Sequence, residues 1–389
     1  MQQTSTRGLS SLFIIYLVSF FYTLHVALPV YVNSTFLATM LPEQWVGLIY
    51  TFSSLLTIFA LIAIPKILRS IGDYFTTVFF IIFEITALLL IGANITPTLT
   101  LIFFIVSSVL ITLISFDFDL IVEKFSKNTA TGTIRGLYLT SANIAWVIAP
   151  ALSGYILGED QFWRMYLASA VIFLPALLIF AQKLERFKDP LYRAIHFGKG
   201  LVTVWNRKDL RYIFFVSFLL YFFFTLMVIY TPIYLHDHIG FAWDKLGFLF
   251  SIMLLPFLLL EAWLGRVADK WLGEKELLVA GFVVMALATG AMSFVTTPLF
   301  ALWAGLLFAT RIGAAMVEIM TETYFFKKID GGDAQIVGLQ RTLRPVAGVI
   351  GPIAATALLL ILPIKGLFLA LAVIMLLGIP CTLLLKDTK

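Results

Sequence analysis

The chain has 389 residues, of which 61% are hydrophobic and 13% are charged, and its formal net charge is +5. A water-soluble protein of this length cannot cover so much apolar surface, so the composition excludes the soluble classes and predicts a protein that lies in lipid. The single cysteine, Cys381, excludes an intramolecular disulfide and a cysteine-cluster metal site. We expect no cofactor, no metal and no nucleic-acid partner.

Twelve segments are long and apolar enough to cross a membrane as helices, which requires about 20 mostly apolar residues. They are residues 9–32, 44–64, 74–93, 98–121, 134–157, 163–181, 209–234, 244–263, 276–296, 298–325, 336–360 and 364–385. The predicted fold class is therefore all-α integral membrane with 12 transmembrane helices. The longest connection separates six segments from six, which predicts an N-terminal six-helix bundle (1–181), a cytoplasmic linker (182–208) and a C-terminal six-helix bundle (209–389).

The Lys and Arg residues of the connections are concentrated on the side of the membrane that carries both termini. By the positive-inside rule both termini are predicted to be cytoplasmic, with the protein in a bacterial-type inner membrane. The linker is also basic, and a helix within it would bury Leu191, Ile195 and Trp205 at the headgroup boundary. The alternative is a solvated linker whose charges only fix the orientation.

Two ionisable residues lie well inside apolar segments of the N-terminal half, away from the segment ends. His25 lies in the first segment, and Glu84 lies near the centre of the third, which carries no basic residue. Such side chains are costly within a membrane, and a buried carboxylate without a partner favours its protonated form. Glu84 and His25 are therefore candidate proton carriers. The alternatives are a structural hydrogen bond from Glu84 to a Thr or Asn and a packing role for His25.

The tenth segment carries a stripe of charged residues. Arg311, Glu318 and Glu322 stand at positions i, i+7 and i+11, which lie along one narrow face of a helix. Arg311 is near the middle of the membrane, where an ionisable side chain usually faces a cavity or a partner, and Glu318 is a candidate for its partner or for a proton carrier. The alternative is a purely structural Arg–Glu pair between helices.

Polar and aromatic residues mark two further segments. Asn143 and Trp146 lie three residues apart in the fifth segment, and Tyr221 lies in the seventh. Aromatic rings with polar groups suit a cavity for an amphipathic or aromatic solute. The same residues also suit a lipid-facing surface or an interface belt.

The sequence contains an internal repeat. One copy reads "DFDLIVEKF", a basic loop and "RGLYLTSANIAWVIAP", and the other reads "EIMTETYFF", a basic loop and "VGLQRTLRPVAGVIGP". Gly136 and Pro150 of the first copy recur as Gly338 and Pro352 of the second. A duplicated pattern half a chain apart, inside apolar segments, is typical of membrane carriers with a two-fold repeat.

The connection after the eighth segment reads "LGRVADKWLGEK" and resembles the signature cytoplasmic loop of the major facilitator superfamily, with Gly265, Asp269 and Lys270 at matching positions. The fifth segment, "NIAWVIAPALSG", is similar to the antiporter motif of the 12-span drug/proton antiporter-type members. The resemblance covers the whole chain. It implies two pseudo-symmetric bundles that alternate access to a central cavity, lined by the first, fourth, seventh and tenth segments. Arg311 in the tenth segment would then contact the solute by charge or hydrogen bonding.

The resemblance also implies charged contacts on the cytoplasmic side. It brings Asp269 towards Arg135, and this pair would hold the two bundles together there; the alternative is an ordinary turn. Acidic and basic residues near the inner ends of the fourth, tenth and eleventh segments could form an inner gate. These candidates are Asp119, Glu123, Glu322, Arg341 and Arg344. The alternative is local neutralisation within each half, through Arg135 or Lys124.

Catalytic motifs are absent from the sequence. There is no HExxH, GxSxG, P-loop lysine or DxD-type metal loop. Asp117 and Asp119 have DxD spacing, but they point to nearly opposite faces of a helix. The "HDH" at His236 to His238 offers too few ligands for a metal site and suits a polar cap at the membrane surface. We therefore expect no enzyme.

The expected function is secondary active transport of a small organic, amphipathic solute by alternating access, as proton-coupled efflux. The expected partners are the solute, protons and the lipid bilayer, and the expected state is a monomer. The alternatives are uptake of a metabolite or sugar by symport or uniport, lipid flipping, and a non-transporting membrane sensor or scaffold. Members of one architecture carry different solutes, so the fold does not identify the substrate.

Overall fold

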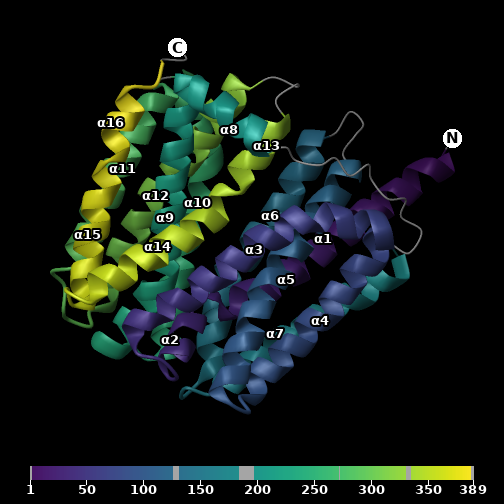
Figure 1. The fold of residues 1–389 in the computed structure, drawn as a ribbon, viewed down its shortest axis with the longest axis horizontal. Coiled ribbons are helices and arrows are strands. Elements are labelled where there is room, and N and C mark those ends of the chain that lie inside the picture. The colour runs from purple at the N-terminus through teal and green to yellow at the C-terminus, as the bar shows by residue number, and fades with distance from the viewer. Residues whose placement is uncertain (1, 126–130, 184–196, 271, 330–333, 387–389) are drawn as a thin grey trace. The chain divides into compact units, whose positions relative to one another are not determined.

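The computed structural model describes residues 2–125, 131–183, 197–270, 272–329 and 334–386. Every regular element within these ranges is a helix (Figure 1). Helices are favoured because the chain is almost continuously apolar, and in lipid a helix pairs its own backbone groups. The chain divides into two compact units, one comprising Met1–Met40 and Phe52–Ala194 and the other comprising Leu41–Thr51 and Ile195–Lys389.

The first seven helices begin in the N-terminal half of the chain. They are α1 (Gln2–Val30), α2 (Asn33–Ala38), α3 (Glu43–Ile71), α4 (Asp73–Ala93), α5 (Pro97–Phe125), α6 (Thr131–Leu157) and α7 (Phe162–Lys183). Within the first unit, α1 packs against α6 and α7, and α4 packs against α5 and α7. Fully buried apolar side chains hold these helices together, among them Ile64, Ile81, Ile114 and Phe173.

The remaining helices belong to the second unit. They are α8 (Phe197–Asn206), α9 (Lys208–Ile233), the π-helical turn η1 (Tyr234–His238), α10 (Trp243–Lys270), α11 (Glu274–Met292), α12 (Phe300–Lys328), α13 (Ala334–Arg341), α14 (Leu343–Leu359), α15 (Ile364–Leu376) and α16 (Gly378–Leu383). Helix α12 packs against α9, α10 and α11, and α9 also packs against α14. The second unit is therefore organised around α12 and α9.

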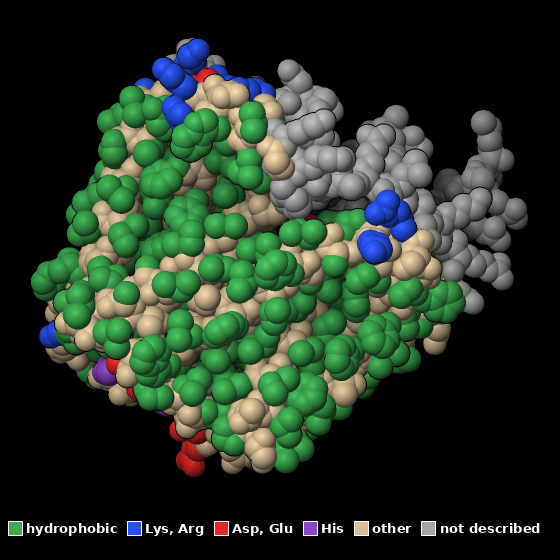
Figure 2. Space-filling view, viewed as in Figure 1, with side chains coloured by type: hydrophobic (Ala, Val, Ile, Leu, Met, Phe, Trp, Pro, Cys, Tyr) green, Lys and Arg blue, Asp and Glu red, His purple; other side chains and the backbone are tan. Residues whose placement is uncertain are grey.

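Each of the twelve predicted segments coincides with a helix or a pair of helices. Among the described residues, eleven helices are long and apolar enough to cross a membrane, and α1 adds the shorter apolar stretch Tyr16–Val30. The prediction of an all-α integral membrane fold is thus confirmed. Large apolar side chains such as Phe59, Phe75 and Leu287 are exposed on the outside of the helices, and Figure 2 shows hydrophobic side chains over most of the visible surface.

The last two predicted segments are each split into two helices. The eleventh is interrupted at Thr342 and the twelfth at Leu377. A proline follows three residues after each interruption, at Pro345 and Pro380. Proline has no N–H to donate, and its ring collides with the carbonyl group four residues earlier, which favours an interruption of the helix there.

Polar side chains gather at the ends of the helices in the second unit. Figure 2 shows Lys and Arg side chains at the end that carries α16 and the C-terminus. At this end Lys327 of α12 forms an ion pair with the buried Glu274 at the start of α11. Lys328 lies 3.8 Å from Asp209 in α9. This charged end and the apolar flanks match a protein that crosses a membrane.

Candidate functional site

Three polar side chains meet in the interior of the first unit. His25 of α1 and Glu84 of α4 are 1% and 0% exposed, and the distance from His25 Nε2 to Glu84 Oε1 is 3.9 Å. The Ser107 hydroxyl of α5 donates a hydrogen bond of 2.7 Å to Glu84 Oε1. The sequence indicated His25 and Glu84 as separate candidates, whereas the structure brings them together.

The imidazole of His25 is held in one orientation. Its Nδ1 lies 2.5 Å from the carbonyl oxygen of Tyr22, and because a carbonyl only accepts, Nδ1 carries the hydrogen. The ring stacks on Phe173 of α7, with centroids 3.8 Å apart. The Ser169 hydroxyl donates to the backbone carbonyl of His25 at 2.7 Å, which fixes α1 at this position. The opposite nitrogen, Nε2, is therefore aimed at Glu84.

A second buried acid lies further along α4 and α5. Asp117 is fully buried and accepts a hydrogen bond of 3.1 Å from the Thr77 hydroxyl, and Asp73 in the first turn of α4 is also fully buried. The sequence analysis gave neither Asp73 nor Asp117 a role. Asp119, two residues after Asp117, is only partly buried, as expected for the opposite side of a helix.

Arg311 occupies the interior of the second unit. Its side chain, on α12, is 1% exposed. The guanidinium carbon lies 5.5 Å from the ring centroid of Phe223 and 5.3 Å from that of Phe224, both on α9. Aromatic ring faces attract a cation, and this attraction strengthens when water is excluded. The aromatic residues of α9 thus help to keep a charge in the core.

Three other predicted charges of the second unit gather around Tyr221. The guanidinium carbon of Arg344 in α14 lies 5.4 Å from the Tyr221 ring centroid. Glu318 and Glu322 of α12 are close enough to Tyr221 to act on it electrostatically. The structure therefore brings Tyr221, predicted as part of an aromatic cavity, close to charged residues predicted for the α12 stripe and the inner gate. The exposure of the α12 stripe increases from buried Arg311 through partly buried Glu318 to exposed Glu322.

The remaining predicted residues are dispersed or lie outside the described part. Asn143 and Trp146 are partly buried on α6, and Arg341 is exposed at the end of α13. An added Cβ at Gly265 would meet no other atom within 4 Å. The side chains of several gate and loop candidates are not among those described, so these hypotheses remain predictions. These residues are Glu123, Lys124, Arg135, Asp269 and Lys270.

The two histidines of the "HDH" sequence have different partners. His236 Nδ1 lies 2.6 Å from Asp237 Oδ1, and His238 Nε2 lies 2.8 Å from Glu43 Oε2. Within the described residues, no group of three His, Cys, Asp or Glu side chains is placed to hold a metal ion. Both histidines are at least partly exposed, as suits the polar end of a membrane helix.

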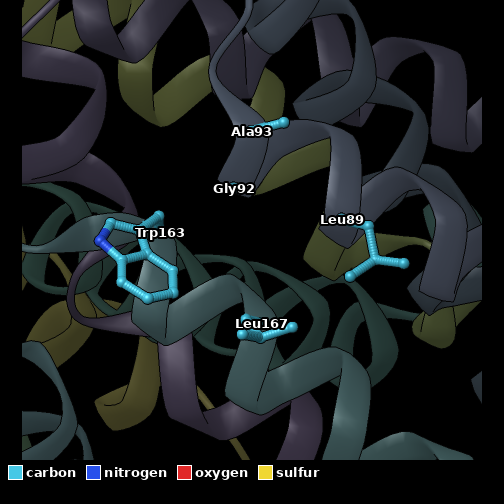
Figure 3. A pocket seen from close by; sticks show the side chains of 5 residues that line it. All are labelled: Leu89, Gly92, Ala93, Trp163 and Leu167. Carbon is cyan, nitrogen blue, oxygen red and sulfur yellow. The ribbon is translucent and has the colours of Figure 1, made fainter.

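A cavity of about 330 Å³ lies between α4 and α7 in the first unit. Figure 3 shows Leu89, Gly92 and Ala93 of α4 facing Trp163 and Leu167 of α7 across it. The lining is almost entirely apolar, and Leu89, Trp163 and Leu167 are between 42% and 51% exposed. A site for a polar solute needs converging polar groups, so this cavity is better suited to a lipid chain.

Sequence reasoning missed Ser107, Thr77, Asp73 and Asp117 as parts of polar clusters. Ser and Thr are common in transmembrane helices, where they often bond to their own backbone, so their type carries little signal. The buried acids were visible as charges inside or beside apolar segments. The contacts that join them depend on helix packing, which a single sequence does not reveal.

Comparison with known proteins identifies the family. The model of the Major Facilitator Superfamily matches residues 119–329 and 213–389. The solved structure of the nucleoside transporter NupG superposes with a TM-score of 0.77 and 12% identity, covering 96% of this chain and 99% of NupG. A point mutant of NupG gives the same TM-score at 13% identity. No match was found among the curated proteins.

The family match covers more than half of the chain, and the structural similarity extends over nearly all of it. The match agrees with the twelve helical spans and with the resemblance to the superfamily carried by the loop that contains Gly265. The chain belongs to the major facilitator superfamily and is a multi-pass membrane transporter.

Proposed function

We propose that the protein is a proton-coupled secondary transporter that exports a small organic, amphipathic solute by alternating access. The observation that carries this proposal is the buried guanidinium of Arg311 on α12, in contact with the rings of Phe223 and Phe224. An ionised side chain in the middle of a membrane protein is costly, and such residues mark solute and ion pathways.

The chemistry around Arg311 favours a particular kind of solute. A guanidinium provides several N–H donors in a fixed plane, which suits a carboxylate, a phosphate or another strong acceptor. The adjacent phenylalanine rings suit an apolar or aromatic moiety. We therefore propose a solute that carries an anionic or strongly accepting group beside an apolar part.

The stripe on α12 offers a polar path to this position. Glu318 follows Arg311 by two helical turns, about 10 Å along the axis, and Glu322 follows one turn later. The increasing exposure from Arg311 to Glu322 leads towards the end of the helix that carries Lys327 and Lys328. By the positive-inside rule we assign this end to the cytoplasm. Glu318 would then be a partner for Arg311, or a proton carrier, between the cytoplasm and the core.

Export is favoured by the fifth segment, whose "NIAWVIAPALSG" is similar to the antiporter motif of the superfamily. Uptake is the second candidate, because the similar fold of NupG is that of a nucleoside transporter. At 12% identity that similarity supports the fold and not the solute. We further propose a monomer in a bacterial-type inner membrane, with both termini in the cytoplasm.

A liposome assay tests the proposal. Purified protein is reconstituted with a pH-sensitive dye inside the vesicles, a proton gradient is imposed, and nucleosides, sugars, organic anions and amphipathic drugs are added in turn. We expect one class of solute to dissipate the gradient. Proton movement opposite to the solute supports export by antiport, whereas movement with the solute supports uptake by symport. Solute flux without proton flux would refute the proposed coupling, and movement of fluorescent lipid alone would favour a flippase.

A further inference from the structure

The buried pair of His25 and Glu84 contains polar atoms without a hydrogen-bond partner among the described residues. Both side chains are at most 1% exposed, yet His25 Nε2 and Glu84 Oε2 have no hydrogen-bond partner among the described residues. The separation of 3.9 Å between Nε2 and Oε1 is too long for a direct hydrogen bond. Unsatisfied polar atoms in a core are costly, so their persistence calls for an explanation other than packing.

The hydrogen bonds around the pair leave two atoms that can accept a proton, Nε2 of His25 and Oε2 of Glu84. Nδ1 of His25 donates to the Tyr22 carbonyl, so in the neutral ring Nε2 is a bare acceptor. Ser107 donates to Glu84 Oε1, which leaves Oε2 as the free oxygen of the carboxyl group. A proton on Nε2 would face Glu84 Oε1 across the separation of 3.9 Å, and a proton on the carboxyl group would be carried by Oε2.

The charge of the pair depends on the number of protons that it holds. With one proton, the pair is either a carboxylic acid beside a neutral imidazole or a carboxylate beside an imidazolium, and its net charge is zero in both cases. Without that proton the pair has a net charge of −1, and with a second proton it has +1. Net charge in a fully buried site is strongly disfavoured. The buried pair therefore retains one proton, and it can release that proton only to water that reaches the site.

The surroundings contain few groups that could compensate another charge state. Tyr22 is the titratable residue in ring contact with His25, with centroids 5.2 Å apart. Asp117 on α5 and Asp73 on α4 are ten and eleven residues from Ser107 and Glu84, about 15 Å along each helix. Arg164 of α7 is exposed five residues before Ser169. The described side chains of α6 include no charged residue.

We propose that His25, Glu84 and Ser107 form the proton-binding site that couples transport to the proton gradient, built entirely within the first unit. This inference rests on the proposed proton-coupled transport and adds the site of coupling. One proton is bound when the site is sealed, and it leaves to water from the carboxyl group of Glu84 or from Nε2 when the site is opened. Ser107 and the Tyr22 carbonyl are positioning groups that orient the two acceptors.

Infrared difference spectroscopy of the reconstituted protein tests proton binding without any solute. The difference between the spectra recorded in acidic and in alkaline buffer should contain a carboxylic-acid C=O band. Glu84→Gln should remove this band. The exposed Glu159, in the loop between α6 and α7, provides the matched control, and Glu159→Gln should leave the band unchanged. A band that persists in Glu84→Gln would overturn the proposal.

The contribution of His25 is tested by His25→Asn, in which the amide N–H can replace Nδ1 as donor to Tyr22 while the base at Nε2 is lost. This variant should shift the pH at which the Glu84 band changes. Ser107→Ala should shift the frequency of the same band, because it removes the hydrogen bond to Oε1. If His25→Asn folds and leaves the pH at which the Glu84 band changes unaltered, His25 does not share the proton with Glu84, and that result would also overturn the proposal.

Transport measurements separate this inference from the proposed function. In Glu84→Gln, solute exchange between two sides at equal pH should persist, whereas accumulation driven by the proton gradient should be lost. If wild type couples solute to protons and Glu84→Gln does so equally well, the site is wrong and the proposed function stands. If wild type moves solute without protons, the proposed coupling and the site both fail.

Discussion

Gly281 and Gly313 lie directly against each other where α11 crosses α12. A Cβ added to Gly313 would come within 2.6 Å of the Gly281 carbonyl oxygen, and one added to Gly281 would come within 2.9 Å of the Gly313 carbonyl oxygen. These two helices form the most extensive helix pair of the second unit. Small residues allow such close backbone approach, which drives helix association in a membrane where lipid tails provide no hydrophobic contrast. The position of Arg311, two residues before Gly313, depends on this crossing.

Gly313→Ala should therefore destabilise the protein. The added methyl group meets backbone atoms that cannot rotate away, and overpacking of this kind costs about 1–3 kcal/mol. Gly305, on the same helix, is exposed with no atom within 4 Å of an added Cβ, and it provides the control. Gly305→Ala should be neutral or stabilising by up to about 1 kcal/mol, because alanine favours a helix. Thermal unfolding in detergent would measure both, and equal midpoints would contradict the close crossing.

Arg311→Gln should reduce transport by tenfold or more. The substitution keeps a hydrogen-bonding group but removes the charge and the planar fork, and a hydrogen bond to a charged group contributes about 1.5–3 kcal/mol. Arg311→Lys should rescue only part of the activity, because an ammonium group cannot reproduce the bidentate geometry. Initial rates of solute uptake into liposomes would measure these effects.

The control for Arg311 is Lys365→Gln, which removes an exposed cation from α15 in the same unit. It should leave the initial rate within about twofold, since exposed charges contribute little. If Arg311→Gln transports at the wild-type rate, Arg311 is a structural residue and the proposed solute contact is wrong.

The positions of the helices could be predicted from the sequence because lipid imposes a simple rule. About 20 apolar residues must form a continuous helix, so hydropathy alone located all twelve spans. The breaks at Thr342 and Leu377 were not predicted, although Pro345 and Pro380 mark them. Proline is tolerated within many membrane helices, including at Pro29 and Pro150 of this chain, so its presence does not by itself locate a break.

The candidate site was predicted only in part. The charged stripe of α12 follows from helical periodicity, because its members lie on one helix. The contact of His25 with Glu84 joins residues 59 positions apart, and the rings of Phe223 and Phe224 beside Arg311 are on another helix. Such contacts depend on how helix faces pack, and nearly every face of this chain is apolar. Hydrophobicity therefore reveals where helices are, but not which of them meet.

The orientation in the membrane can be tested with a single reporter cysteine. Cys381→Ser removes the native thiol, after which Glu159→Cys and Lys386→Cys each provide one exposed site. The positive-inside rule predicts that residue 159 faces outwards and that residue 386 faces the cytoplasm. A membrane-impermeant maleimide should label Glu159→Cys in intact cells and Lys386→Cys only after permeabilisation. The reverse pattern would show that the topology is the opposite of the predicted one. The end of α12 that carries Lys327 and Lys328 would then face outwards and not the cytoplasm.

Helix α8 should lie at the lipid headgroup boundary. Leu201, Val202 and Trp205 share one face of this helix and are 56%, 61% and 70% exposed. The guanidinium carbon of Arg211 lies 5.5 Å from the Trp205 ring centroid, so a cation flanks the apolar face. An amphipathic helix with basic neighbours binds the membrane interface through both features. Of the three residues that the sequence placed on an interfacial helix, only Trp205 is described, and Leu191 and Ile195 lie outside the described residues. The interfacial placement of α8 is therefore a prediction.

Fluorescence quenching by lipids that carry bromine near the headgroup tests this placement. The chain has 8 tryptophans, and Trp205→Phe should lower the part of the emission that brominated lipid quenches if Trp205 touches lipid. The control is Trp303→Phe, which removes a fully buried indole from α12 and should leave the quenched emission unchanged. A solvated α8 would instead make Trp205 accessible to iodide in water and insensitive to brominated lipid. In that case its exposed apolar face would need a protein partner, because lipid would not cover it.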